Sequence, residues 1–273
     1  MKLTWAAVMA CCLTLATIAG AQTIPNTPRA MGMGNAVIGV ADDAGAWSQN
    51  PAGLGALHVA TKDGNSWGHD IVVGFGEINP GNDDLAINWS GWNPTTTIGL
   101  GAGYNGLGHT ETFGAGFGMS YNKTMFSWGV DVMRIKNDSH SDTALDLGAM
   151  YRFIRPGKPS TRLGLKISDI GDSTDAGPQV GLGVSWTAAE NLMVAVDVAD
   201  ISGKSAHGPF INAGAEYRLG KTNEWSARGG LFDAGDGHKL TLGVGLVLPK
   251  VRLDLGYMNT DSSSWMVGAG FDF

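Results

Sequence analysis

The feature that most constrains the fold is an alternation of apolar residues with small or polar ones, from about residue 68 onward. In 239–246, for example, leucine or valine occupies every second position, between Lys, Thr and Gly. A period of two is typical of β-strands. Turn-forming clusters interrupt the pattern and divide it into fourteen predicted strands. These strands are 68–76, 84–92, 96–104, 110–121, 124–134, 142–153, 161–169, 178–187, 191–200, 208–218, 223–232, 238–248, 251–259 and 264–273.

The two faces of these strands indicate whether the fold is soluble or lies in a membrane. Ionisable residues lie near strand middles on the face that also carries the glycines. In a soluble sandwich or barrel, the alternative, these charges would face a dry core at a cost of several kcal/mol each unless paired. A membrane barrel instead turns its apolar face to lipid and its polar face to the lumen. We therefore predict an all-β fold, a transmembrane antiparallel β-barrel over 67–273. Its lumen-facing charges would be Asp131, Asp146, Lys166, Asp197, Arg228 and Asp254.

Composition fits this class. Charged residues are 16% of the chain, against about 25% in ordinary soluble domains. Tryptophan and tyrosine recur near the predicted strand ends, where membrane barrels carry aromatic girdles. The girdle residues would be Trp89, Tyr104, Tyr121, Trp186, Tyr217, Trp225, Tyr257 and Trp265.

Several functions are disfavoured. The net charge of −7 argues against a nucleic-acid binder. Both cysteines, Cys11 and Cys12, lie in the N-terminal stretch, and no two of the six histidines have a metal-site spacing. The segment 101–106 matches the dinucleotide-binding GxGxxG pattern, but a strand follows it where a helix is needed. Ser139–Asp142 has the residue types of a hydrolase triad, but adjacent loop residues rarely reach triad geometry. We expect no enzyme, no cofactor and no bound metal.

The two ends of the chain indicate export. Residues 1–21 have the basic start (Lys2), apolar middle (Trp5–Ile18) and small-residue site (Ala19–Ala21) of a cleaved signal peptide, with a membrane anchor as the alternative. The last strand is amphipathic and stops at Phe273. This resembles the C-terminal signal of bacterial outer-membrane barrels, which implies the barrel assembly machinery as a partner. We expect the outer membrane of a diderm bacterium, with its lipid around the barrel.

Residues 22–66 lack the strand pattern. Two prolines open an irregular stretch, 42–49 is predicted as a short helix that stops before Pro51, and 57–61 as a further short strand.

One part of this stretch is similar to a known family. Arg-Ala, Gly-x-Gly, Val-Ala-Asp-Asp-Ala and Asn-Pro-Ala-Gly-Leu occur in order between residues 29 and 54. This resembles the N-terminal signature of the FadL-like outer-membrane transport superfamily, particularly its PorV/PorQ-type branch. The resemblance implies a fourteen-stranded barrel with an N-terminal hatch, 22–66, inside the lumen. The hatch residues it marks are Arg29, Gly32, Gly34, Asp42, Asp43, Asn50, Pro51, Ala52 and Gly53.

The resemblance leaves alternative functions open. The first is hatch-gated passage of small hydrophobic molecules across the outer membrane. The second is a PorV-like accessory role, in which a non-transporting barrel binds exported proteins or a secretion system. The third is a purely structural barrel. The large ligand-catching outside loops of the fatty-acid transporters have no counterpart, because 67–273 leaves little chain beyond the strands.

Overall fold

The structure is a computed structural model that describes residues 25–57, 67–78, 83–107, 110–121, 125–136, 141–153, 160–171, 177–203, 209–220, 222–233, 237–259 and 263–273. The predicted signal peptide 1–21 lies outside these ranges. No helix within the described ranges is long and apolar enough to cross a membrane.

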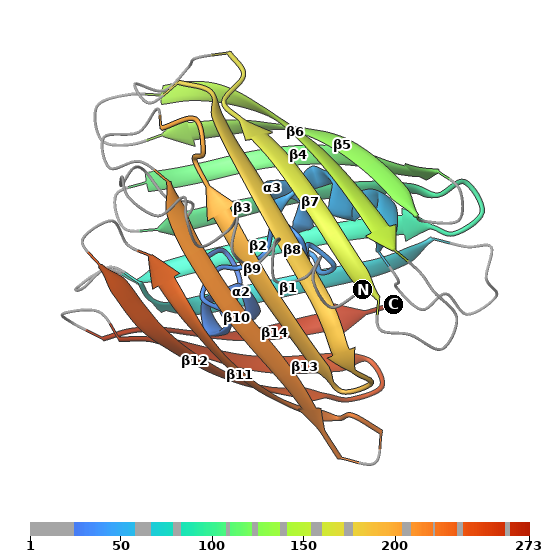
Figure 1. Cartoon of the computed structure of the whole chain (residues 1–273), viewed down its shortest axis with the longest axis vertical. Coiled ribbons are helices and arrows are strands. Elements are labelled where there is room, and N and C mark those ends of the chain that lie inside the picture. Colours follow the sequence, from blue (N-terminus) through green and yellow to red (C-terminus); the bar gives the residue numbers. More distant parts are fainter. Residues whose placement is uncertain are drawn as a thin grey trace, which may run out of the picture.

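Fourteen strands form one closed antiparallel barrel, in which each strand pairs with its neighbours in sequence and β1 pairs with β14 (Figure 1). The prediction of fourteen strands is confirmed, and predicted bounds differ from observed ones by at most three residues. The strands are β1 (Gly68–Glu77), β2 (Asp84–Asn93), β3 (Ile98–Leu107), β4 (Thr110–Tyr121), β5 (Phe126–Lys136), β6 (Ser141–Phe153), β7 (Thr161–Ser168), β8 (Gln179–Ala189), β9 (Leu192–Ala199), β10 (Phe210–Leu219), β11 (Trp225–Asp233), β12 (His238–Val247), β13 (Val251–Met258) and β14 (Ser264–Asp272).

The seam between the first and last strands is fully formed. The β1–β14 register runs from Asp70 opposite Asp272 to Glu77 opposite Trp265. Two backbone bonds extend it: the His69 N–H donates to the Phe273 carbonyl oxygen at 2.9 Å, and the Phe273 N–H donates back at 3.1 Å. The predicted GxGxxG segment, 101–106, lies within β3, so it has no helix after it.

The barrel exposes its apolar face. In β12, Leu240, Leu242 and Val244 are each about half exposed, whereas Thr241 between them is fully buried. The same alternation occurs in the other strands, so the soluble arrangement with the apolar face inside does not describe this molecule. An apolar outer surface is the arrangement that a lipid-facing barrel wall requires.

The two ends of the barrel differ. We call the end that carries Phe273 and the turn 94–97 the turn end, and the opposite end, where β7 stops at Ser168, the loop end. Exposed aromatic residues of the predicted girdle cluster at the turn end: Tyr121, Trp186, Tyr217 and Trp225. Trp89, also near this end, stacks on His69.

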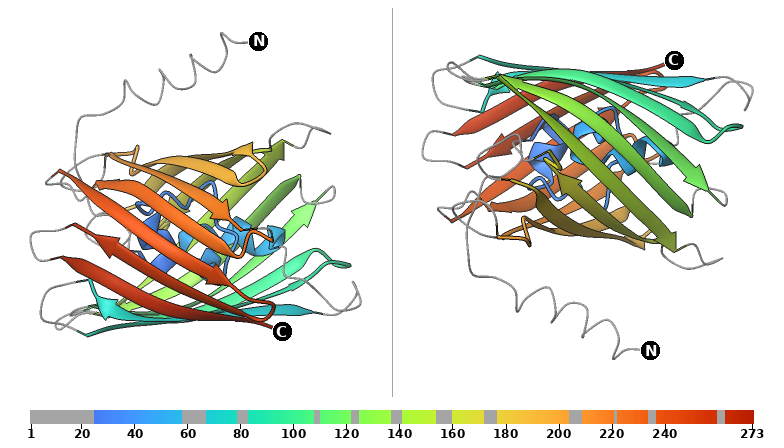
Figure 2. Two further views of the ribbon diagram at one scale, coloured as in Figure 1. Left: turned by 90° about the horizontal axis from the view of Figure 1, so that it is seen from below. Right: turned by 90° about the horizontal axis from the view of Figure 1, so that it is seen from above.

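Residues 25–57, which we call the inner segment, lie inside the barrel (Figure 2). The inner segment contains α2 (Pro28–Gly32), α3 (Ala46–Gln49) and the 3-10 helix η1 (Pro51–Ala56). Thr27 caps α2 by accepting from the Ala30 N–H, and Pro28 occupies the first helical turn, where its missing N–H is not needed. The helices contact strands from opposite parts of the wall, α2 on β11–β14 and η1 on β2–β6.

The predicted helix over 42–49 is shorter in the structure and begins at Ala46. The Asp43 side chain accepts from the Gly45 N–H at 2.9 Å, a local bond that competes with helical structure. Asn50 ends α3 and caps η1 by accepting from the Ala52 N–H. Of the predicted strand 57–61, only Leu57 lies within the described residues, and it is not in a strand.

Glycines on the inward face let the inner segment approach the wall backbone. A Cβ atom at Gly214 of β10 would overlap the Met33 carbonyl oxygen, and one at Gly99 of β3 would overlap the Leu54 carbonyl oxygen. A side chain at either position would therefore displace the inner segment, which gives the glycines of the polar face a packing role.

Candidate functional site inside the barrel

Arg29 of α2 joins the inner segment to the wall. Its Nε donates to the Glu216 Oε2 of β10 at 2.9 Å, and its Nη1 donates to the Asp42 Oδ1 at 2.6 Å. Asp43 lies farther away, with its Oδ2 at 3.5 Å from the same Nη1. The Arg29 side chain is 15% exposed and that of Glu216 is 2% exposed, so water screens this pair little.

Asp42 has a second partner in the wall. The Arg162 Nη1 of β7 donates to its Oδ2 at 2.9 Å and also to the Val40 carbonyl oxygen at 2.9 Å. Burial opposes ionisation of Asp42, but the attraction of Arg29 and Arg162 outweighs it and holds the pKa of this carboxyl well below its usual range. Asp42 is therefore an ionised bridge between two guanidinium groups.

Glu216 connects three arginines. Besides Arg29, it accepts from the Arg228 Nε at 2.8 Å and pairs with the Arg218 Nη2 at 3.1 Å. Arg228 in turn donates to the Asp254 Oδ1 at 2.5 Å. We call Arg29, Asp42, Arg162, Glu216, Arg228 and Asp254 the turn-end network.

A second group of charges, the loop-end cluster, consists of Asp131, Asp146 and Lys166. The Lys166 Nζ is 2.8 Å from the Asp146 Oδ2 and also donates to the Ser48 carbonyl oxygen of the inner segment. The Asp146 Oδ1 accepts from the Asp169 N–H at 2.9 Å. Asp131 lies opposite Asp146 in the β5–β6 register and is fully buried. Neither of its oxygens accepts a hydrogen bond from the described residues.

Two wall carboxylates bind the inner segment's backbone directly. Asp197 of β9 accepts from the Ile38 N–H at 2.6 Å, and Asp70 of β1 accepts from the Ala44 N–H at 2.9 Å. Asp70 is also paired with the Arg252 Nη2 of β13 at 2.6 Å. Because the inner segment is largely irregular, these bonds replace the secondary-structure partners that its buried N–H groups lack.

The structure places all six sequence-predicted lumen charges inside the barrel. It brings Arg228 together with Asp254, and Asp131 together with Asp146 and Lys166. Sequence reasoning missed four equally important charges: Asp70, Arg162, Glu216 and Arg252. Each lies at an inward position of its strand, so the alternation of apolar and polar residues in the sequence already indicated that its side chain faces the lumen.

The other predicted hatch residues have structural roles. Gly34 adopts a positive φ of 61° after α2, which favours glycine. Gly32 packs on Gly243, and a Cβ atom at Gly53 would overlap the Ala41 carbonyl oxygen. The Asn50 Nδ2 donates to the Ile38 carbonyl oxygen at 2.8 Å. Pro51 and Ala52 begin η1, and both are buried.

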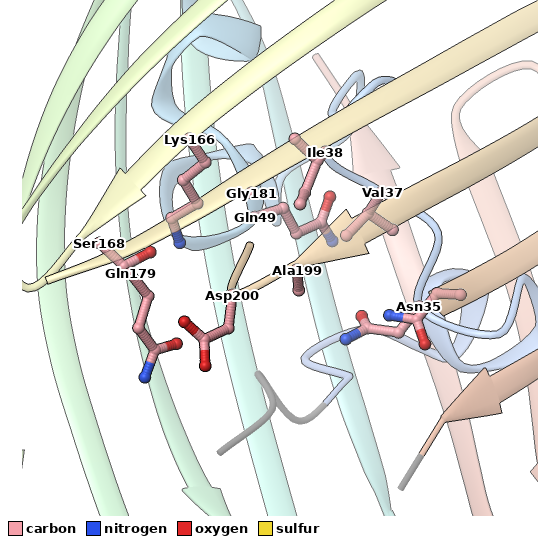
Figure 3. Close-up of a pocket in the computed structure, with 11 residues that line it drawn as sticks. Asn35, Val37, Ile38, Gln49, Lys166, Ser168, Gln179, Gly181, Ala199 and Asp200 are labelled. Atoms are coloured by element: carbon pink, nitrogen blue, oxygen red, sulfur yellow. The ribbon is translucent and has the colours of Figure 1, made fainter. Parts of the chain in front are cut away.

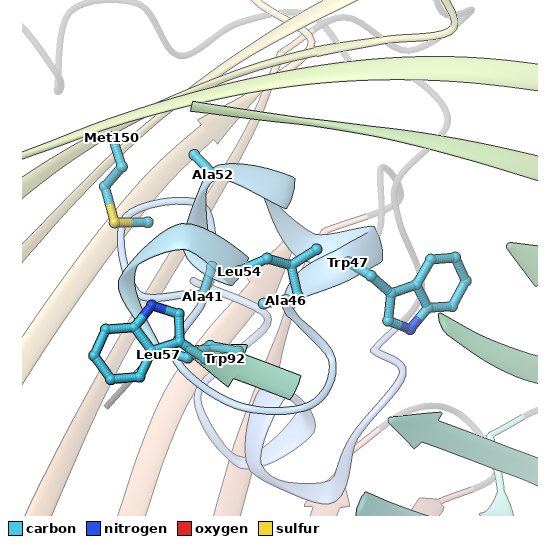
Figure 4. Packing of buried hydrophobic residues seen from close by; sticks show 8 residues of the cluster. All are labelled: Ala41, Ala46, Trp47, Ala52, Leu54, Leu57, Trp92 and Met150. Atoms are coloured by element: carbon cyan, nitrogen blue, oxygen red, sulfur yellow. The ribbon is translucent and has the colours of Figure 1, made fainter. Parts of the chain in front are cut away.

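An apolar cluster fixes the second half of the inner segment (Figure 4). Trp47, Leu54 and Leu57 pack there with Trp92 of β2 and Met150 of β6. The two indole groups are satisfied as well: the Trp47 Nε1 donates to the Asn88 Oδ1 at 2.8 Å, and the Trp92 Nε1 to the Gly55 carbonyl oxygen at 3.2 Å. Apolar packing and hydrogen bonding thus act on the same residues.

Two recesses lie on either side of the inner segment. The loop-end recess has about 490 Å³ of empty space, part of it open to solvent, and Ile38, Gln49 and Lys166 contribute to its lining (Figure 3). The turn-end recess has about 220 Å³ and is lined in part by Ala56 and Arg162.

Two of the six histidines, His69 and His238, lie within the described residues. Among the described residues, no group of three or more His, Cys, Asp or Glu side chains is placed to hold a metal ion. His69 packs between aromatic rings, and His238 is exposed at the start of β12. His58, His109, His140 and His207 lie outside the described residues, as does Ser139, whereas Ser141 and Asp142 begin β6.

Comparison with known proteins supports the fold. No protein-family model and no curated protein matches the sequence. The outer membrane protein Omp33 of Acinetobacter baumannii has a TM-score of 0.53 and 9% identity, covering 77% of this chain and 98% of its own. A mutant porin of Rh. blastica has a TM-score of 0.45 at 9% identity, covering 76% and 99%. A bacterial polysaccharide outer membrane secretin has 0.43 at 11% identity, covering 77% and 98%.

The likeness to Omp33 shows that this chain has the fold of an outer-membrane β-barrel. Membership of the FadL-like superfamily or its PorV/PorQ-type branch stays a prediction.

Proposed function

We propose that the protein is a non-catalytic barrel of the bacterial outer membrane whose inner segment is a hatch that gates passage of small molecules. The observation that carries the proposal is that the inner segment fills the space between the two recesses and is bound by charged wall residues from several strands. The apolar outer face supports the membrane location.

The many contacts between the inner segment and the wall indicate that only part of the segment moves when the barrel opens. Removing one partner of a buried ion pair costs about 3–5 kcal/mol, and the turn-end network contains several such pairs. Loss of the whole inner segment would break the ion pairs of Arg29 and Asp42 with the wall, together with the apolar cluster around Trp47. Movement of a short part of it would break only a few.

The strip 38–42 is the part best placed to move. Ile38 contributes to the loop-end recess, whereas Val40 and Asp42 bind Arg162, which lines the turn-end recess. Within the strip, Ala41 has a φ of +30°, in the region that residues with a side chain rarely adopt. Such a backbone persists only where its surroundings hold it, and Arg162 supplies part of that hold.

Single-channel conductance in planar bilayers tests the proposal. Deleting 23–54 provides the open reference, and we expect a large rise in conductance over the full chain. Arg162→Ala removes the wall contacts of Val40 and Asp42, leaves that of Ile38 with Asp197, and should give frequent partial openings. Arg218→Ala is the matched control, because Arg218 is 52% exposed and does not bond the inner segment. A deletion variant that is folded but no more conductive than the full chain would show that the inner segment is not a gate.

Two observations point to different classes of solute. The resemblance to the FadL-like superfamily implies a hydrophobic ligand, whereas the loop-end recess is lined mostly by polar side chains. We therefore propose polar solutes for the recess and keep hydrophobic molecules as the alternative to be measured in the same bilayers.

A second candidate function is the PorV-like accessory role. The closely filled interior favours it, since a barrel that only binds other proteins has no need of a path through its lumen. Co-purification of exported proteins or secretion components with the full chain, and conductance unaffected by the deletion, would together support this role. We also propose that the barrel assembly machinery recognises β14 and Phe273, which is 63% exposed at the turn end.

A further inference from the structure

The loop-end recess is built from both parts of the molecule. The inner segment contributes Asn35 and Gln49, and β8 contributes Gln179 (Figure 3). Asn212 of β10 completes this set. About 490 Å³ of empty space lies between these side chains, and part of it is open solvent. A solute arriving from the loop end would meet this recess, with Ile38 in its lining, before it met Arg162 in the turn-end recess.

Carboxamides dominate the polar lining. Each of these four side chains carries two N–H donors and a carbonyl acceptor. A ligand hydroxyl group both donates and accepts, so a carboxamide can pair with it in either direction. Ser168 adds a hydroxyl of its own to the same recess. Four carboxamides and a hydroxyl around one space therefore match a ligand with many hydroxyl groups.

The charges of the recess disfavour an anionic ligand. The Lys166 ammonium is already balanced by Asp146 and donates to Ser48. The other charged group in the lining, Asp200, is a carboxylate whose Oδ1 accepts from the Ser202 Oγ at 2.8 Å. An anion would face Asp200 without an unbalanced cation, whereas a neutral diol can donate to a carboxylate.

Part of the lining is apolar and part is held in place. Val37, Ile38 and Ala199 provide aliphatic surface suited to the C–H face of a sugar ring. The Gln49 Nε2 donates to the Asn26 Oδ1 at 2.9 Å, and the Asn212 Oδ1 accepts from the Asp233 N–H at 3.0 Å. Side chains fixed before binding lose less conformational entropy when a ligand arrives.

From this lining, we infer that the loop-end recess binds a small, neutral solute rich in hydroxyl groups. The inference rests on the proposed function, because it treats the recess as the entrance above the hatch. It concerns binding alone, so it can be measured without any passage through the barrel.

Titration calorimetry on the full mature chain tests the inference. The protein would be kept in lauryldimethylamine oxide, a detergent without sugar, and titrated with glucose, maltose, acetate and glycine betaine. We expect saturable binding of glucose or maltose with one site per barrel, and no saturable binding of acetate or betaine. Absence of sugar binding, or preference for acetate or betaine, would overturn the inference.

Variants place the binding in the recess. Gln179→Met removes one carboxamide at similar side-chain length, and Ala199→Leu fills part of the recess. Each variant should weaken sugar binding by about tenfold or more, which is the loss expected when one polar contact of a ligand is removed. Thr96→Ala, at the exposed turn-end loop 94–97, is the control and should bind as the parent does. Heat-modifiable gel migration would verify that each variant is folded. Equal affinity in all three variants would place the sugar elsewhere and overturn the inference.

Different results would contradict the gate and the sugar-binding recess. Sugar binding without any effect of the 23–54 deletion on conductance would contradict the gate and leave the binding site standing. A gated barrel that binds no sugar would contradict the binding site alone.

Discussion

Arg29 and Glu216 are 187 residues apart in the sequence and form an ion pair at 2.9 Å inside the barrel. Glu216 also pairs with Arg228 and Arg218, so one wall carboxylate binds guanidinium groups from α2, β11 and its own strand. The position of the inner segment therefore depends on a residue near the end of β10.

Glu216→Ala should destabilise the barrel and loosen the inner segment. The change leaves Arg29 and Arg228 buried without this partner, and breaking a buried pair in this way costs about 3–5 kcal/mol. Glu111→Ala, which removes the exposed pair with Lys136, is the control and should cost no more than about 1 kcal/mol. Urea unfolding in lipid vesicles measures both, and equal small effects would show that the turn-end network contributes little.

Gly214→Val should prevent the inner segment from docking. Any Cβ atom at Gly214 overlaps the Met33 carbonyl oxygen, whereas Gly229 of β11 has its nearest such neighbour at 3.9 Å. Gly229→Val is therefore the matched control on the adjacent strand. Limited proteolysis should cut within 25–57 in the Gly214 variant while the barrel stays intact. Equal protection in both variants would contradict the close approach.

Asp131→Leu and Asp146→Leu should change stability in opposite directions. Neither oxygen of Asp131 accepts a hydrogen bond from the described residues, so replacing this buried acid by an apolar side chain should raise stability by about 1–3 kcal/mol. Asp146 is the ion partner of Lys166, and its loss should lower stability by about 3–5 kcal/mol. A stabilising effect of Asp146→Leu would show that Lys166 is bound by other groups.

Leu242→Arg should reveal the lipid-facing belt. Leu242 is 51% exposed at the middle of β12, and an arginine at the bilayer midplane costs about 2–4 kcal/mol. Leu246→Arg, on the same outward face but at the turn end of the strand, should cost about 0–1 kcal/mol. Folding free energies in vesicles provide the comparison, and equal costs would contradict a membrane-spanning wall.

The strands could be predicted because each carries its own signal. Leu240, Leu242 and Val244 point one way and Thr241 and Gly243 the other, which is local information. The same periodicity placed the predicted charges on the inward face, and it placed Glu216 and Arg162 there too, although only the charges near strand middles were singled out. Those two belong to the turn-end network, which lies nearer the strand ends.

The pairings could not be predicted in the same way. Which carboxylate Arg29 meets depends on where α2 lies within the barrel and on the register of strands distant in sequence. The start of α3 was missed because the Asp43 side chain replaces helical bonds with a local one. Lys166 bonds a backbone carbonyl oxygen, that of Ser48, and carbonyl groups have no sequence signature at all.

The close contact between wall glycines and the inner segment also bears on how the molecule is made. The inner segment precedes β1 in the chain, yet it touches strands from β2 to β14, with its backbone against theirs at Gly99 and Gly214. A finished wall with a complete β1–β14 seam offers no clearance through which such a segment could be threaded sideways. The wall is therefore expected to close around the inner segment during biogenesis. In that order of events, residues 25–57 help to set the register in which the last strands pair.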